Sequence, residues 1–105
     1  MAKKESLSNS TQTKPKLNQW TFLSNHAHVL ICLSKDPGSR LKDVATLVGI
    51  TERAVQAIVR DLIDAKILER TKDGRRNMYS IKTKQKLRHA LESNHSISEL
   101  IQLGR

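Results

Sequence analysis

The sequence predicts a mainly α-helical fold with one small β-hairpin. Apolar residues recur at helical spacing in three stretches between Ser24 and Ala65, which indicates three helices. Apolar and polar residues then alternate on both sides of an Asp73-Gly74 pair, which is a strong hairpin signal. An apolar stripe near the C-terminus predicts a last helical segment. The expected architecture is therefore a three-helix core, a hairpin and a C-terminal helical segment.

The first helix is expected to start after a cap at Ser24 or Asn25 and to run to about Lys35. Its centre, residues 29–33, is apolar on nearly every side, so the helix must be buried on more than one side. In a chain this small, we expect a second subunit to cover the other side. Residues 36–38, Asp-Pro-Gly, end the helix.

Residues 41–62 form the central unit of the chain, two helices joined by a tight turn. Gly49 follows the first apolar run, where a helix end needs a residue that tolerates a left-handed backbone. Thr51 precedes the second run and can cap its free N–H groups. The small Ala45 allows the two helices to cross closely. A short edge strand is expected just before the first of them, at Ser39-Arg40. This spacing is typical of a helix-turn-helix, whose second helix commonly enters the DNA major groove, although other small helical domains share it.

The second helix of this unit divides into a buried and an exposed face. Its apolar residues are expected to face the core: Val55, Ile58, Val59 and Leu62. On the exposed face, Arg53 can pair with guanine and Gln56 with adenine, and the small Ala57 lets the helix sit deep in a groove. Arg53 pairing with an acid or a phosphate is the alternative. Neighbouring side chains are expected to contact phosphates, which position the protein without specifying sequence: Arg40, Lys42, Thr51 and Arg60.

The hairpin follows directly after these helices. Its strands are expected over residues 67–72 and 77–81, and its tip carries Lys72, Arg75 and Arg76. A hairpin in this position with guanidinium groups at its tip is a wing, which can place arginine near phosphates or in a minor groove. A charged turn that only improves solubility is the alternative interpretation.

The two ends of the chain differ from this central part. Residues 1–19 are polar and basic, so they cannot bury enough apolar surface to offset their ordering entropy, and we predict a disordered basic arm. Residues 82–105 are expected to be helical with a break. The first part is the Lys-rich stretch Thr83–Leu91, and a capping box at Ser96–Glu99 starts the second. That second helix has an apolar stripe in need of a covering partner: Ile97, Leu100 and Ile101.

The charge of the chain is strongly positive, with 19 basic and 10 acidic residues and a net charge of +9. Such an excess suits a polyanionic partner, although a merely soluble basic protein would also show it. The excess is shared among the two ends and the centre, so the ends assist binding without forming the specific site. The scarcity of aromatic residues argues against a stacking platform for single strands.

Other features concern location and chemistry. The single Cys32 excludes an intramolecular disulfide and fits a reducing cytosol. The N-terminus lacks an apolar signal segment, and no stretch approaches the roughly 20 apolar residues needed to span a membrane. We therefore expect a cytoplasmic, nucleoid-associated protein. Without a phosphate-binding glycine loop, a nucleophile elbow or a paired-carboxylate motif, we expect neither enzymatic activity nor a cofactor.

A metal-responsive function is an alternative for the first helix. His28 and Cys32 are four residues apart and share a helical face, and their ligand types suit zinc or copper. One thiol and a few histidines make a poor closed site, and Cys32 also fits a small buried apolar residue. We expect no metal.

Three stretches resemble the winged helix-turn-helix transcriptional regulators of bacteria and archaea, the MarR/ArsR-like group: residues 20–27, 49–56 and 74–79. The resemblance covers residues 20–81 and implies a three-helix core with a small sheet, dimerisation and operator DNA binding. Two positions depart from the pattern. Lys66 stands where such proteins often have glycine, which predicts a strained or different turn, and Ala90 stands where proline is expected, which predicts a more continuous C-terminal helix.

Together these observations predict a sequence-specific double-stranded DNA-binding transcriptional regulator that acts as a homodimer. The second helix of the central unit would lie in the major groove, and the Arg-tipped hairpin on the backbone or in the minor groove. Dimerisation is assigned to apolar residues near both ends of the folded part: Trp20, Phe22, Leu30, Leu33, Ile97, Leu100 and Ile101. A protein-interaction module without a DNA function is the alternative, and structured RNA is disfavoured because its major groove does not admit a helix.

Overall fold

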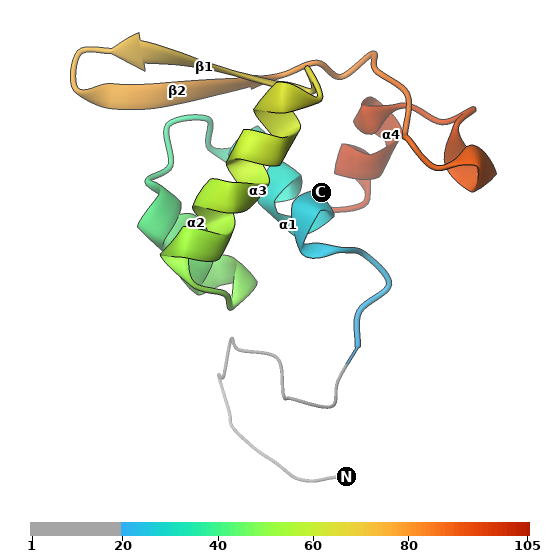
Figure 1. Cartoon of the computed structure of the whole chain (residues 1–105), viewed down its shortest axis with the longest axis horizontal. Coiled ribbons are helices and arrows are strands. Elements are labelled where there is room, and N and C mark those ends of the chain that lie inside the picture. The colour runs from blue at the N-terminus through green and yellow to red at the C-terminus, as the bar shows by residue number, and fades with distance from the viewer. Residues whose placement is uncertain (1–19) are drawn as a thin grey trace, which may run out of the picture.

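The computed structural model describes residues 20–105, and the predicted basic arm over residues 1–19 lies outside them. Three helices are followed by a hairpin and a short fourth helix, which is a winged helix-turn-helix fold (Figure 1). The elements are α1 (Asn25–Lys35), α2 (Leu41–Val48), α3 (Glu52–Asp64), β1 (Leu68–Asp73), β2 (Arg76–Ile81), a 3-10 turn η1 (Ala90–Glu92) and α4 (Ile97–Gln102). The hairpin and α4 lie on opposite sides of α3 in this view.

The start of α1 and the turn between α2 and α3 have the predicted caps. The Ser24 hydroxyl accepts a hydrogen bond from the Ala27 amide, and the Thr51 hydroxyl accepts one from the Ala54 amide at 3.0 Å. Gly49 ends α2 with a φ of 87°, a left-handed conformation that glycine adopts without a Cβ penalty. These three local predictions are confirmed because each depends only on residues within one turn of the helix end.

The turn after α3 holds Lys66 in a left-handed conformation, with a φ of 63°. Its amide donates to the Ile63 carbonyl at 2.9 Å, and the next amide, of Ile67, donates to the Leu62 carbonyl at 3.0 Å. These bonds close the end of the helix in the manner of a C-terminal cap, where glycine is the usual residue. The strain predicted from the absence of glycine here is therefore present in the backbone.

Lys66→Gly is expected to stabilise the protein by about 0.5–1 kcal/mol, because relief of the left-handed strain exceeds the entropy that glycine adds to the unfolded chain. The measurement is the free energy of urea unfolding. Lys42→Gly is the matched control, since Lys42 is exposed within α2. That change should destabilise by about 1 kcal/mol. Equal losses for the two variants would contradict the account of this turn.

The hairpin pairs antiparallel from Leu68 with Ile81 to Asp73 with Arg76. Gly74 sits in its turn with a φ of 66°. The short edge strand expected at Ser39-Arg40 is wrong, since the sheet has two strands within residues 20–105. Both the amide and the hydroxyl of Ser39 bond back to the Asp36 carbonyl, which closes a turn, and the extended Arg40 belongs to no strand of the sheet in the described residues.

The helix expected over Thr83–Leu91 is also wrong. Backbone groups of this stretch pair with the segment that leads into α4: the Ile97 amide donates to Gln85 at 2.8 Å, and the Leu87 amide donates to His95 at 2.9 Å. This stretch has few apolar residues that could stabilise a helix by packing one of its faces. Extended backbone pairing is therefore more stable here than a helix. Only the turn Ala90–Glu92 is helical, and it is of the 3-10 type.

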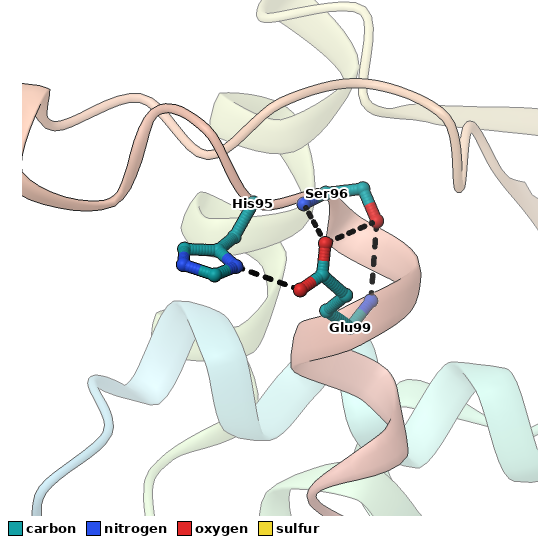
Figure 2. A network of polar contacts seen from close by, with 3 residues as sticks. All are labelled: His95, Ser96 and Glu99. Atoms are coloured by element: carbon teal, nitrogen blue, oxygen red, sulfur yellow. Dashed lines mark hydrogen bonds and ion pairs between the residues drawn. The ribbon is translucent and has the colours of Figure 1, made fainter.

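The capping box predicted at the start of α4 is confirmed (Figure 2). The Ser96 hydroxyl accepts from the Glu99 amide at 3.3 Å, and the Glu99 carboxylate accepts from the Ser96 amide at 3.0 Å. The second carboxylate oxygen of Glu99 accepts from Nδ1 of His95 at 2.7 Å. This network fixes the start of a helix that is too short to be stable alone.

Acidification is expected to weaken this network. Hydrogen bonds from His95 and the Ser96 backbone lower the pKa of Glu99 below its ordinary value of 4.5. Because the pKa is lower in the folded state, the stabilisation is complete above the unfolded pKa and is lost as pH falls through the folded one. Glu99→Gln removes this titration, so its unfolding free energy should fall less between about pH 5 and pH 3. Identical pH profiles of urea unfolding for the two proteins would refute the effect.

The core lies where α1 crosses the other helices. α1 contacts α2, α3, α4 and β2, so α4 of the same chain covers part of its second side. Four residues assigned to dimerisation are buried here at 1–4% exposure: Leu30, Leu33, Ile97 and Ile101. Within the single chain these four side chains pack into the core, and their assignment to a dimer interface stays a prediction. Trp20 and Phe22 are exposed and Leu100 is half-buried.

Candidate nucleic-acid interface

The two faces of α3 are separated as predicted. Its apolar residues are 0–7% exposed and pack into the core: Val55, Ile58, Val59 and Leu62. Thr51 caps the helix, which starts at Glu52, and the chain leaves it at Ala65 toward the hairpin. The helix is therefore held by one face and by both ends, which leaves its other face open along its length.

The open face of α3 presents the predicted base-reading side chains. Arg53, Gln56, Ala57 and Arg60 are all exposed. Their spacing of three and four residues places them on one stripe of the helix. Within residues 20–105, no ion pair involves Arg53 or Arg60. A guanidinium and an amide thus project from the same exposed surface, separated by one helical turn.

The predicted phosphate contacts flank this stripe in the helix-turn-helix. Arg40 immediately precedes α2, and Lys42 is in its first turn, and both are exposed. The Thr51 oxygen accepts from the α3 backbone, which leaves the hydroxyl proton free to donate to a phosphate. A helix N-terminus favours anions, so the start of α3 adds its own partial positive charge.

The three basic residues predicted at the tip of the hairpin, the wing, have different surroundings. Lys72 and Arg75 are exposed. Nη2 of Arg76 instead donates to the carbonyl of Gly38, in the loop between α1 and α2. A second link joins the same parts, since the Tyr79 amide donates to the Pro37 carbonyl at 3.0 Å. The hairpin is thereby fixed to the helical core.

The role of Arg76 could not be inferred from sequence spacing. The one signal in the sequence for this contact is the glycine at position 38. Gly38 is buried against the hairpin, and a Cβ at this position would lie 3.2 Å from Sδ of Met78. A glycine in a turn is usually explained by its backbone freedom, so the close approach of a distant strand is not visible locally.

The helix that carries His28 and Cys32 gathers no set of metal ligands in the part of the chain that the structure describes. Nδ1 of His28 lies 3.3 Å from the Asn25 side-chain oxygen. Burial raises the pKa of the Cys32 thiol, which disfavours the thiolate that a metal would need. His26 instead bonds across to α3, with Nε2 at 2.9 Å from Oδ2 of Asp61, a contact that the sequence did not predict.

Comparison with protein families supports this assignment of the fold. A family described as winged helix-turn-helix DNA-binding matches residues 25–69, which span α1, α2, α3 and the start of β1. The match covers the helix-turn-helix and agrees with the winged helix-turn-helix fold seen in the structure. Searches of curated proteins and of solved structures gave no match. Among residues 20–105, no helix is long and apolar enough to cross a bilayer.

Proposed function

We propose that the protein is a sequence-specific, double-stranded DNA-binding transcriptional regulator without catalytic activity, which acts at the nucleoid in the cytoplasm. The single observation that carries this proposal is the open face of α3, where Arg53 and Gln56 project from a helix of groove-fitting size. The match to a DNA-binding family over residues 25–69 and the net charge of +9 support it.

In this proposal α3 lies in the major groove, with Arg53 on a guanine and Gln56 on an adenine. Ala57 lets the helix approach the base edges, while Arg40, Lys42, Thr51 and Arg60 contact phosphates. The wing places Lys72 and Arg75 on the adjacent backbone or in the minor groove. Arg76 contributes by holding the wing to Gly38.

We further propose that the regulator binds as a homodimer through the exposed apolar surface near α1. Trp20 and Phe22 are 73% and 92% exposed, and their rings meet edge to face with centroids 4.8 Å apart. Exposed aromatic pairs of this kind are typical of protein interfaces. Two copies would place their α3 helices about 34 Å apart, one turn of DNA, on a roughly palindromic site. A sedimentation measurement should give a dimer, and Trp20→Ala with Phe22→Ala should give a monomer.

The test of the function is duplex binding across a salt series, followed by fluorescence anisotropy of labelled DNA. A DNA-binding winged helix should bind a random duplex weakly and lose affinity steeply as salt rises, because counterions are released. Failure to bind any duplex at low salt would favour a protein-interaction module instead. Binding of double-stranded RNA as tight as that of DNA would contradict major-groove insertion.

Arg75→Ala is expected to weaken binding to all duplexes alike and to reduce the salt slope by about 0.9, the loss of one phosphate contact. Its side chain is exposed at the hairpin turn, so the fold should not change. Glu69→Ala, on the neighbouring strand, is the control that removes a charge of opposite sign. An unchanged slope for Arg75→Ala would rule out phosphate contact by the wing tip.

A further inference from the structure

A cavity of about 1080 Å³ lies between α1, the end of α3, the segment 87–95 and α4. Its apolar lining includes Leu30 and Leu62, which belong to the core, and the half-buried Leu87 and Leu100. The size is near the upper end of cavities that hold small molecules, and a mainly apolar lining with a few polar groups is typical of them. No part of the proposed DNA interface lines it.

The charge of this cavity is opposite to that of the protein. Four of the ten acidic residues line it, Asp61, Asp64, Glu92 and Glu99, against one arginine, Arg88. Two of the four carboxylates accept from histidines that also line the cavity. Asp64 and Glu92 are exposed and make no ion pair within residues 20–105. The opening of the cavity is therefore a negatively charged region in a chain of net charge +9, and it favours binding of a cation.

An aromatic ring stands at the same opening. Phe22 lines the cavity and is 92% exposed, with Trp20 against its edge. These two rings are assigned to the dimer contact in the proposed function, so the positive charge of a ligand is assigned to the carboxylates alone. The opening offers carboxylates to a positive charge, and the interior offers an apolar surface to a hydrocarbon body.

We infer that this cavity is an effector site for a small hydrophobic ammonium compound, with its apolar body against Leu62 and Leu100 and its charge near Asp64 and Glu92. Because Asp61, Leu62 and Asp64 lie on α3, such a ligand contacts the helix that carries Arg53 and Gln56. Regulation of DNA binding by the ligand rests on the proposed function. Binding of the ligand itself does not.

The first experiment therefore uses the full chain without DNA and three probes of one shape: 4-phenylbutylammonium, 4-phenylbutanol and 4-phenylbutyrate. Trp20 is the only tryptophan and meets Phe22 edge to face beside the cavity, so its fluorescence reports on the opening. Calorimetry supplies the affinity. The ammonium compound should bind with a Kd of about 1 mM or below, and the alcohol and carboxylate at least about fivefold more weakly. Equal affinity for all three, or no binding of the ammonium compound, would overturn the inference.

The second experiment locates the charge. Asp64→Asn with Glu92→Gln should weaken binding of the ammonium compound about 5- to 20-fold, with little change for the alcohol. Asp43→Asn with Asp73→Asn removes the same charge outside the cavity and should leave the affinity unchanged. Equal losses in both double variants would overturn the site. An affinity that falls as protein concentration rises would show that a second copy of the chain fills the cavity, which also overturns it.

The last experiment addresses regulation. The ammonium compound at saturation should change the affinity for duplex DNA at least about threefold in the wild type and not in the cavity variant. If the compound binds but DNA affinity does not change, the effector role is wrong while the binding site stands. If no duplex is bound with or without the compound, the proposed function fails instead, and the DNA-free measurements still decide the site.

Discussion

Replacing Arg53 with alanine is expected to weaken binding to the specific DNA site by about 1–3 kcal/mol, which is roughly 5- to 150-fold in Kd. The guanidinium is exposed on the open face of α3 and makes no ion pair within residues 20–105. The variant should therefore fold normally and lose only its contact with the DNA. Binding to random duplex should fall much less, because phosphate contacts dominate it.

The matched control for this change is Arg70→Ala. Arg70 is also exposed but lies on β1, away from the stripe that carries Gln56 and Ala57. Both variants lose one positive charge, so a purely electrostatic effect would be the same for the two. A selective loss on the specific site for Arg53→Ala supports base recognition, whereas equal losses on specific and random duplex would show that Arg53 contacts a phosphate.

Leu33→Ala is expected to lower the free energy of unfolding by about 2–5 kcal/mol, the cost of a cavity in a well-packed core. Leu33 is 1% exposed and belongs to the cluster in which α1 meets the other elements. That loss is a large share of the roughly 5–15 kcal/mol that stabilises a typical domain. Urea unfolding followed by circular dichroism measures it directly.

Leu47→Ala is the control for this prediction, because Leu47 on α2 is 67% exposed. Its effect should stay within about 0.5 kcal/mol. The pair also tests the burial of α1 within one chain. If Leu33→Ala cost less than Leu47→Ala, or acted only by dissociating a dimer, then α1 would be covered by a partner subunit, as its sequence first suggested.

The helix ends and the hairpin could be predicted because their signals are local. A left-handed conformation at Gly49, a hydroxyl cap at Thr51 and the Asp73-Gly74 turn each depend on a few neighbouring residues. The open face of α3 also followed from the sequence, since its apolar residues occupy one side at helical spacing. The strain at Lys66 was expected from a missing glycine and is seen in its φ.

The features that escaped prediction depend on distant parts of the chain. Residues 83–87, after the hairpin, form backbone hydrogen bonds with residues 95–98. No helical or strand pattern in the sequence predicts this pairing. Arg76 bonds to a loop 38 residues away, and the His26–Asp61 contact spans 35 residues. The apolar α1 indicated burial on several sides, but the pattern could not show that α4 of the same chain supplies one of them.

The most direct test of the central claim is selection of bound sequences from a random duplex pool, carried out in parallel with the wild type, Arg53→Ala and Gln56→Ala. The account predicts that the wild type enriches one motif with a preferred guanine and adenine. Each variant should then lose the preference at a different single position and keep the rest of the motif. No enriched motif for the wild type, or the same motif for all three proteins, would contradict recognition of DNA bases by α3.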